Sequence, residues 1–396
     1  MRFPEFEGEW ETKKLGEIAD KIGDGLHGTP TYLSDSEFYF INGNNLVNGK
    51  IELNENTKNI DIETYERNRK GLKENTLLIS LNGTIGNIAR YNNENVMLGK
   101  SVGYFNFDKA SDFIYFSLQT KATQNYFKSE LTGSTIKNLS LKTLRETPIT
   151  LPYQNEQNKI VSFLSLIDGR ILTQNKIIEE LSVLKTNIAK KIFSQKTRFQ
   201  DNGNVFSPWK KYKLKNIANR IVEKNSENNQ NVLTISAQHG LISQLEFFNK
   251  SVAAKNILGY YLLKKNDFAY NKSYSNGYPM GAIKRLNQYE KGVVSTLYIC
   301  FEFNHLVNKD FMEHYFESGI QNSEIEKVAQ EGARNHGLLN IGVSDFFNIT
   351  INLPSIDEQK AIASLLSSLV SKIENEKQIL NQLNLQKQFL LKELFI

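Results

Sequence analysis

The hydrophobic pattern of the chain contains the same long helix twice. Apolar residues recur at spacings of three and four over 151–193 and again over 353–395, and 14 of these 43 positions are identical at a constant offset of 202. An apolar stripe of this kind, sustained over about five heptads, is typical of paired helices. The pattern therefore predicts two helices of about 40 residues, each about 60 Å long at 1.5 Å per residue.

Each predicted helix needs a partner for its apolar stripe, and the simplest partner is the other helix. A pseudo-twofold relation between the repeats makes that pair antiparallel, with Gln174 and Glu376 near its centre, where polar residues fix register. The alternative is an ordinary helical hairpin, but a whole domain separates these two helices. The predicted pairing residues are Leu164, Ile167, Ile171, Gln174, Leu181, Leu366, Leu369, Ile373, Glu376 and Leu383.

The second helix carries a recognisable start signal after Pro354. Ser355 and Glu358 have the spacing of a capping box, in which each side chain bonds the backbone of the other residue, and Asp357 is the competing cap. Asp357 and Glu358 together place negative charge at the positive end of the helix dipole. We therefore expect these carboxylates to stabilise the helix start rather than to act in catalysis.

The repeat extends beyond the helices. Residues 10–22 match residues 209–221 at an offset of 199, each beginning with a tryptophan, whereas the middle stretches 23–150 and 222–352 align poorly. Two repeats with similar ends and divergent middle stretches suggest a common scaffold that carries two different recognition regions. The predicted division is a first recognition domain at 1–150, a helix and linker at 151–200, a second recognition domain at 201–352 and a final helix at 353–396.

The two variable regions are predicted to be mixed and rich in strands. Residues 77–90 and 268–285 each suggest a strand, a glycine-containing turn and a second strand. A further apolar segment follows each of them, at 97–107 and 292–300. The expected fold class is therefore α+β, with two pseudo-repeated domains that are each followed by a long helix, and with the helices paired as an antiparallel coiled coil.

Polar loops rich in Asn, Ser, Thr, Gly and Tyr are the candidate chemistry of these domains. Amides bond adenine bidentately, and small hydroxyls and glycine-exposed backbone NH groups suit phosphates and base edges. Ordinary turns need the same residues, and the loops that hold Lys137 and Arg334 have solvation as an equal alternative. The candidate DNA-binding residues are His27, Gly28, Thr29, Asn42, Asn44, Asn45, Asn82, Thr84, Ser134, Lys137, Asn138, Gln238, His239, Asn271, Lys272, Tyr274, Ser275, Asn276, Tyr278, Arg334 and Asn335.

Composition narrows the class of protein. With 396 residues, 40% of them hydrophobic and 23% charged, the chain has room for two ordinary globular domains. The single cysteine, Cys300, excludes a disulfide framework, and the first residues have no apolar signal core, so we expect a cytoplasmic protein. A net charge of +5 is mild, so any nucleic-acid contact needs locally arranged basic residues or charge from another subunit.

Sequence signatures of catalysis are missing. The chain contains no Walker A sequence and no glycine-rich dinucleotide fingerprint after a strand. The five histidines are dispersed without metal-ligand spacing, and no Asn-Pro-Pro-Tyr or Asp-Pro-Pro-Tyr sequence is present. We therefore predict a non-catalytic subunit that binds no metal or cofactor of its own.

The whole chain resembles the specificity subunit of type I restriction-modification systems. The resemblance rests on the Leu-Pro-x-x-x-Glu-Gln-x-x-Ile signals at 151–160 and 353–362, the two long helices, and the Asn-Gly-Thr-Ile-Gly and Tyr-Ser-Asn-Gly-Tyr-Pro turns. It implies two target-recognition domains that each read half of a bipartite site in double-stranded DNA. It also implies helices that space these domains and dock two methyltransferase subunits, which use S-adenosylmethionine, and further restriction subunits that translocate and cut DNA.

Two other interpretations compete with this one. A coiled-coil scaffold whose globular domains bind proteins would make the polar loops incidental and would lack DNA affinity. The recognition subunit of a system that cuts close to its site would share the same architecture and differ only in its partners. An autonomous nuclease is disfavoured because no acidic metal-binding cluster is evident in the sequence.

Overall fold

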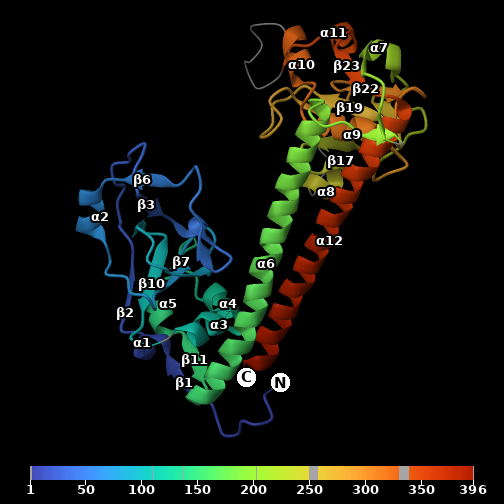
Figure 1. The fold of residues 1–396 in the computed structure, drawn as a ribbon. Coiled ribbons are helices and arrows are strands. Elements are labelled where there is room, and N and C mark those ends of the chain that lie inside the picture. The colour runs from blue at the N-terminus through green and yellow to red at the C-terminus, as the bar shows by residue number, and fades with distance from the viewer. Residues whose placement is uncertain are drawn as a thin grey trace. The chain divides into compact units, whose positions relative to one another are not determined.

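The computed structural model describes residues 2–109, 111–135, 137–201, 203–248, 257–329 and 339–395. The chain divides into two compact units (Figure 1). Unit 1 comprises residues 1–175 and 378–396, and unit 2 comprises residues 176–377. Each unit thus contains one strand-rich domain together with a part of both long helices.

Unit 1 is built on a four-stranded antiparallel sheet of order β2-β10-β7-β8. The predicted strand, turn and strand of residues 77–90 form its β7–β8 hairpin. The apolar side chains of β7 are buried, as a strand covered on both faces requires. The strands are β2 (Lys21–Asp24), β7 (Leu77–Ser80), β8 (Ile88–Arg90) and β10 (Val102–Asn106).

Smaller sheets and short helices complete unit 1. A three-stranded sheet has the order β6-β3-β9, the β4–β5 hairpin lies near β8, and β1 pairs with β11 beside the start of α6 (Figure 1). The strands are β1 (Glu11–Lys14), β3 (Phe38–Ile41), β4 (Leu46–Val47), β5 (Lys50–Ile51), β6 (Lys58–Ile60), β9 (Val96–Leu98) and β11 (Pro148–Leu151). The helices are α1 (Leu15–Ile18), η1 (Gly43–Asn45), α2 (Ile62–Asn68), α3 (Asp112–Gln119), α4 (Lys121–Ser129) and α5 (Leu141–Glu146).

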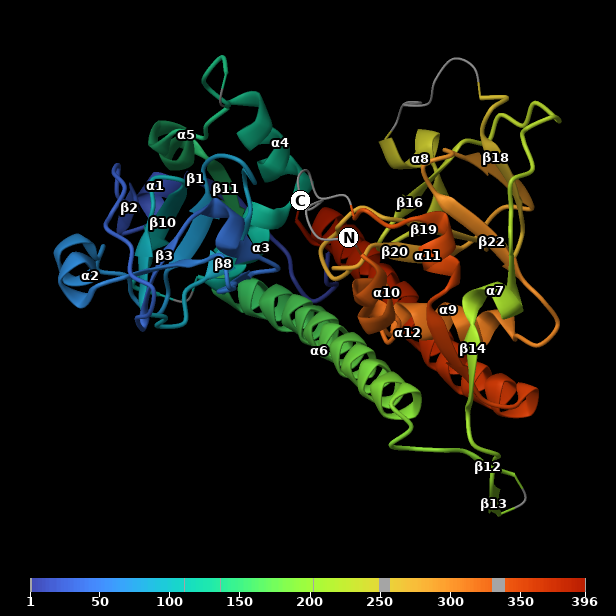
Figure 2. The same cartoon turned by 90° about the horizontal axis from the view of Figure 1, so that it is seen from above.

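Unit 2 repeats the central sheet of unit 1 in the same order, as β15-β22-β19-β20. The predicted hairpin of residues 268–285 forms β19 and β20, joined by a longer loop than its counterpart in unit 1. In each unit one helix packs against the edge strand of this sheet, α3 against β8 and α9 (Lys309–Glu317) against β20 (Figure 2). The strands are β15 (Ala218–Arg220), β19 (Phe268–Asn271), β20 (Ala282–Arg285) and β22 (Ile299–Phe303).

Three hairpin or strand pairs surround this sheet in unit 2, namely β14-β23, β16-β17 and β18-β21, and the β12-β13 hairpin follows α6. The pair β14-β23 corresponds to β1-β11, because each joins the tryptophan-led segment to the strand before a long helix. The strands are β12 (Gln200–Asp201), β13 (Asn204–Val205), β14 (Lys210–Lys213), β16 (Leu233–Ser236), β17 (Gly240–Ser243), β18 (Tyr261–Lys264), β21 (Lys291–Val294) and β23 (Thr350–Leu353). The remaining short helices are α7 (Leu214–Ile217), α8 (Gln244–Phe248), α10 (Asn322–Val328) and α11 (Val343–Phe347).

The two predicted long helices are continuous. α6 (Gln154–Phe193) has 40 residues and α12 (Ile356–Leu394) has 39. In unit 1, Leu164 near the start of α6 shares a core with Leu390 and Leu394 at the end of α12. In unit 2, Ile192 at the end of α6 shares a core with Leu366 near the start of α12. Each unit thus packs the start of one helix against the end of the other.

An aromatic corner marks the repeat in both cores. In unit 1, Trp10 lies edge-on to Phe113 of α3 at 6.1 Å between ring centroids, and Phe395 packs on Phe113 at 5.0 Å. In unit 2, Trp209 and Phe311 of α9 stand in the same relation at 6.1 Å, and Phe193 packs on Phe311. Phe113 and Phe311 differ by 198, so this offset defines equivalent positions on α3 and α9. A fully buried aromatic side chain of this size contributes about 2–3 kcal/mol through burial.

Candidate nucleic-acid interface

Three of the predicted DNA-binding residues of unit 1 come together around one small cavity. His27, Asn82 and Asn138 line a cavity of about 190 Å³, although they come from different parts of the chain. Asn82 and Asn138 are joined by a β-bridge, and an imidazole nitrogen of His27 lies 2.6 Å from a carboxylate oxygen of Asp24. Gly28 and Thr29 are exposed beside them. The arrangement presents amide and imidazole groups on an accessible surface.

Other predicted residues of unit 1 form hydrogen bonds with other parts of the protein. Asn45 is only 5% exposed and donates to the carbonyl of Glu52, at 2.9 Å, and to the hydroxyl of Thr57. The amide oxygen of Asn42 accepts a hydrogen bond from the Ser101 hydroxyl at 2.9 Å. Burial of a satisfied amide is the turn alternative of the sequence analysis, so we leave Asn45 out of the proposed interface.

Thr84 also supports loop structure, since its hydroxyl donates to the Gly43 carbonyl at 2.8 Å. Asn44, on the short helix η1, is exposed instead. In the loop that follows α4, Ser134 and Lys137 are exposed, and the backbone of Asn138 pairs with that of Thr132. These loops combine a rigid base with exposed polar tips.

In unit 2, the β19–β20 loop carries five of the predicted residues, and a sixth, Asn271, is the last residue of β19. Tyr274 is 63% exposed and Asn276 is also exposed, whereas Ser275 and Tyr278 are half-buried and joined by a β-bridge. Asn271 accepts a hydrogen bond from the Ser273 backbone at 3.0 Å. The exposed tip of the loop thus lies between Asn271, which bonds the Ser273 backbone, and Tyr278, which is bridged to Ser275. Lys272 also faces inward, since its ammonium approaches the Ile341 carbonyl at 3.5 Å.

Gln238 and His239 form the exposed tip of the β16–β17 hairpin in unit 2. Together with Tyr278 they line a cavity of about 510 Å³, whose other walls come from β20, α9 and the long helices. The predicted Arg334 and Asn335 lie outside the described residues, so the structure does not place them. Three of the remaining candidates of unit 2 therefore converge on one cavity.

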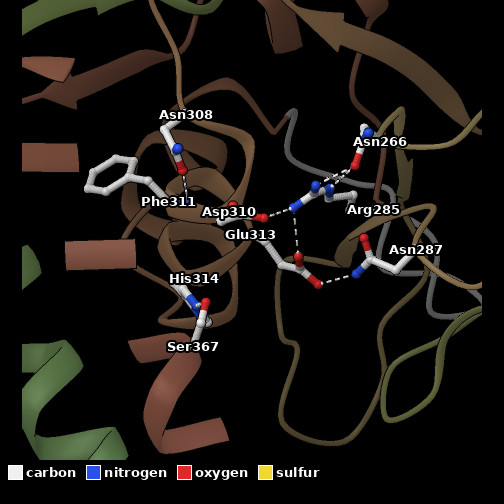
Figure 3. Close-up of polar contacts among 9 residues, drawn as sticks. All are labelled: Asn266, Arg285, Asn287, Asn308, Asp310, Phe311, Glu313, His314 and Ser367. Carbon is white, nitrogen blue, oxygen red and sulfur yellow. Dashed lines mark hydrogen bonds and ion pairs between the residues drawn. The ribbon is translucent and has the colours of Figure 1, made fainter. Parts of the chain in front are cut away.

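An ion-pair network at the end of β20 was not anticipated from the sequence. Figure 3 shows Arg285 reaching from β20 to two carboxylates of α9, with Asp310 at 2.5 Å and Glu313 at 3.3 Å. Asn287 donates to the other oxygen of Glu313 at 2.6 Å. Burial raises the pKa of Glu313, while Arg285 opposes this effect. The network fastens the edge strand to the helix.

His314 of α9 contacts the hydroxyl of Ser367 on α12 at 3.0 Å (Figure 3). Desolvation by burial lowers the pKa of His314 to about 4, and the positive charge of Lys185 acts in the same direction. The imidazole is therefore neutral near pH 7. It joins the strand-rich domain of unit 2 to α12 without adding charge.

Unit 1 uses different side chains at the equivalent junction. The guanidinium of Arg90, at the end of β8, lies 3.5 Å from the Tyr115 ring centroid and pairs with Asp112 at 2.9 Å. Lys387 of α12 pairs with Asp168 of α6 at 2.7 Å and donates to Gln119 of α3 at 2.8 Å. The domain of unit 1 is thus held to both helices by one lysine.

A buried carboxylate stands at the start of each long helix. Glu156 is bonded by Arg2 through two contacts of 2.7 Å, and Glu358 by Arg198 through two contacts of 2.8 Å. The indole of Trp209 also donates to Glu358, at 3.2 Å. Sequence analysis assigned Glu358 to a capping box, and that assignment is wrong in part. Ser355 does cap the backbone NH of Glu358 at 3.3 Å, but the Glu358 side chain bonds Arg198 instead of the helix backbone.

Metal-binding clusters are missing from the described part of the chain. No group of three or more His, Cys, Asp or Glu side chains is arranged there to hold a metal ion. Cys300 is buried, and burial raises the pKa of its thiol to about 12. Within the same residues, no helix combines the length and the apolar character that crossing a membrane requires.

Comparisons with known proteins agree with this architecture. A family model described as type I restriction modification DNA specificity domain matches the chain twice, over residues 7–183 and 187–385. The type I restriction enzyme MjaVIII specificity subunit of Methanocaldococcus jannaschii is 24% identical over 333 residues, which cover 80% of this chain and 77% of the relative. The MjaIX specificity subunit of the same organism is 26% identical over 185 residues, or 44% of this chain and 42% of the relative.

Two solved structures share the fold over nearly the whole chain. The type I restriction-modification system S subunit from M. genitalium has a TM-score of 0.54 at 18% identity and covers 100% of this chain and 99% of its own. A chain from a structural study of complex assembly and conformational transition in the type I R-M system has a TM-score of 0.52 at 12% identity, with 97% of each chain covered.

Proposed function

This chain belongs to the type I restriction modification DNA specificity domain family, and we propose that it reads a bipartite DNA site, with one half read by each recognition domain. As a specificity subunit of a type I restriction-modification system it is a non-catalytic recognition subunit. The observation that carries the proposal is the repeated sheet order, β2-β10-β7-β8 and β15-β22-β19-β20, with different loops on each copy. One scaffold with two sets of loops suits a target with two different halves.

The proposed DNA interface consists of exposed and half-buried polar loop residues. Amides and hydroxyls read base edges, while lysines and backbone NH groups contact phosphates. We propose that the neighbouring loop residues, which form hydrogen bonds inside the protein, hold these contact residues in place. The proposed contacts are His27, Gly28, Thr29, Asn44, Asn82, Ser134, Lys137 and Asn138 in unit 1, and Gln238, His239, Tyr274, Ser275 and Asn276 in unit 2.

We further propose that the long helices set the spacing between the two half-sites. Half-sites read from one face of DNA lie about 34–36 Å apart, one helical turn, or a multiple of that distance. Helices of 40 and 39 residues are each about 60 Å long, which is sufficient for such a spacing. The pairing of α6 with α12 along their whole length is part of this proposal.

The same helices offer a surface for two copies of one partner. Phe163 and Leu365, related by the offset of 202, are both 37% exposed. Val183 and Leu385, related in the same way, are 54% and 50% exposed. Exposed apolar side chains at repeated positions mark an interaction surface that occurs twice. We assign it to two methyltransferase subunits, which bind S-adenosylmethionine and flip the target base, with the restriction subunits joining that complex.

Mapping of methylated bases tests the proposal directly. Cells that express this chain with its neighbouring methyltransferase subunit should methylate a motif of two short blocks separated by an unspecified gap, and cells without the chain should not. Replacing residues 23–150 with another recognition region should change only one of the two blocks of the methylated motif. If both blocks changed, the assignment of one half-site to each domain would be wrong. Absence of chain-dependent methylation from a complex shown to form would favour the protein-binding scaffold.

The helix surface has its own test. Leu164 and Leu366 are fully buried in the cores that the helices share, so Leu164→Asp or Leu366→Asp should prevent assembly with the methyltransferase. Exposed Leu166 provides the matched control on α6, because Leu166→Asp leaves those cores intact. Normal complex formation by either core variant would refute the helix pairing.

A further inference from the structure

A clamp of three side chains holds the base of the β19–β20 loop. Lys284 of β20 donates to Glu317 of α9 at 2.5 Å and to the Tyr278 hydroxyl at 2.9 Å. The Tyr278 hydroxyl donates in turn to the second oxygen of Glu317 at 2.6 Å. Burial and the neighbouring carboxylate raise the pKa of Tyr278, so its hydroxyl keeps the proton that it donates.

The burial of Lys284 indicates that this clamp serves geometry more than stability. Its side chain is only 7% exposed, and removing an ammonium from water is expensive. Replacing a buried ion pair by apolar residues of similar volume is often neutral or stabilising. What such a pair provides reliably is a defined position for its members and for the Tyr278 side chain that both contact.

That position is passed to the loop through its backbone. The NH of Tyr278 donates to Ser275 at 2.8 Å, and the NH of Gly281 donates to Tyr278 at 3.2 Å. Gly281 has a φ of +73°, and a Cβ there would lie 2.3 Å from the Asn271 carbonyl, so the exit of the loop tolerates little change. Tyr274, at the other side of the turn, is 63% exposed. The clamp thus fixes one end of a short turn whose tip faces solvent.

Unit 1 has no such clamp at the corresponding place. The residue equivalent to Lys284 is Ala89, next to Arg90, and the residue equivalent to Glu317 is Gln119, which bonds Lys387. Its β7–β8 loop is held instead by Gln124, which donates to the Gly86 carbonyl at 3.1 Å. A substitution in the clamp should therefore affect only the β19–β20 loop of unit 2.

We propose that Lys284 and Glu317 are positioning residues for DNA recognition, which act through Tyr278 to hold the β19–β20 loop in the conformation that reads one half of the target. This inference rests on the proposed function. Tyr278 becomes an anchor of the loop rather than a base contact, and the exposed tip around Tyr274 and Asn276 makes the contact with DNA.

Two measurements on the full chain test the inference. In hydrogen exchange, Lys284→Met should speed exchange of the Tyr278 and Gly281 amides roughly tenfold, because the loop base opens locally. In methylation mapping with the partner subunit, the same variant should relax discrimination roughly tenfold at one half of the motif and leave the other half unchanged. Glu317→Gln keeps an acceptor for the tyrosine and should show a smaller effect.

Lys291→Met is the matched control, since Lys291 pairs with Glu227 on the exposed surface of the same unit. It should alter neither the exchange of the loop nor the motif. If Lys284→Met does not fold, the double variant Lys284→Met/Glu317→Leu replaces both charges together and leaves no carboxylate without its partner.

The outcomes separate this inference from the proposed function. Uniformly weaker methylation with an intact motif, or an unchanged motif, would overturn the positioning role. If the wild-type chain directs no bipartite methylation, the proposed function fails and the role in specificity fails with it. The hydrogen-exchange measurement does not depend on the methylation result. Faster amide exchange in Lys284→Met would show that the clamp holds the loop, whether or not the chain directs methylation.

Discussion

Arg90 in unit 1 and Arg285 in unit 2 end equivalent edge strands, and each reaches the helix that packs beside its strand. Both bind an aspartate in the first turn of that helix, Asp112 or Asp310. One turn later the surroundings diverge, because Arg90 stacks on Tyr115 whereas Arg285 pairs with Glu313. The comparison teaches that the repeat preserves the fastening of strand to helix while the chemistry around it is free to change.

The repeated lysine of the long helices shows the same divergence. Lys185 and Lys387 are identical at the offset of 202. Lys387 pairs with Asp168, but the position equivalent to Asp168 is Val370, and Lys185 instead lies in the cavity that His314 also lines. At this junction unit 1 therefore has a charged lysine that bonds Gln119 of its domain, and unit 2 has a neutral imidazole that bonds Ser367 of α12. The two junctions should respond differently to mutation and to acid.

The largest expected effect comes from breaking the carboxylate anchor of unit 2. Glu358→Ala removes the carboxylate that Arg198 and the Trp209 indole share. We expect the free energy of unfolding to fall by about 2–3 kcal/mol, less than for a fully buried pair, because Arg198 still donates to the carbonyls of Phe206 and Ser207. Denaturation followed by tryptophan fluorescence measures it in a Trp10→Phe background, where Trp209 is the only tryptophan.

Glu156→Ala in a Trp209→Phe background provides the comparison in unit 1. Glu156 binds Arg2 but takes no bond from Trp10, whose indole nitrogen has no hydrogen-bond partner in the described structure. The loss should therefore be smaller than that in unit 2. Equal losses would show that the indole bond to Glu358 contributes nothing measurable.

Acid should weaken unit 2 through His314. The pKa of this imidazole in the folded protein is about 4, below its ordinary value of 6.5, so its contribution to stability is complete above pH 6.5 and is lost as the pH falls toward 4. We expect a loss of about 2 kcal/mol over that interval. Asp310, Glu317, Arg285 and Lys185 also influence this site, so the difference from a His314→Phe variant isolates the imidazole.

Phe116 occupies the equivalent position in unit 1, which makes His314→Phe the natural comparison. The stability of that variant, reported by Trp209, should vary less between pH 6.5 and pH 4 than that of the wild type. Parallel pH profiles would indicate that His314 is as readily protonated in the folded chain as in the unfolded chain.

The smallest expected difference concerns the repeated lysine. Lys387→Met removes one ion pair and one hydrogen bond from partly buried partners, so it should destabilise unit 1 by about 1–2 kcal/mol. Lys185→Met should change the stability of unit 2 by less than about 0.5 kcal/mol, since Lys185 forms no ion pair among the described residues and Val370 takes the place of the aspartate. Thermal unfolding of both variants decides the point, and equal effects would contradict the difference drawn between the two junctions.

Much of the fold could be predicted because its signals are local. The apolar stripe of 151–193 and its repeat indicated both long helices, and the alternating segments around 77–90 and 268–285 indicated the hairpins that form β7–β8 and β19–β20. Every position of the predicted seams is buried or half-buried. The candidate site was harder to predict, because Asn45 and Asn44 look alike in sequence yet one is buried and the other exposed.

The duplication, the helices, the strand-rich domains and the type of polar loop could all be predicted from the amino-acid sequence, because periodicity and turn chemistry act over a few residues. The tertiary structure alone decided which side chains meet. Arg198 and Glu358 are 160 residues apart, and Lys284 and Glu317 are 33 apart. No local spacing encodes such pairs, since they depend on how the strands and helices cross once the core has packed.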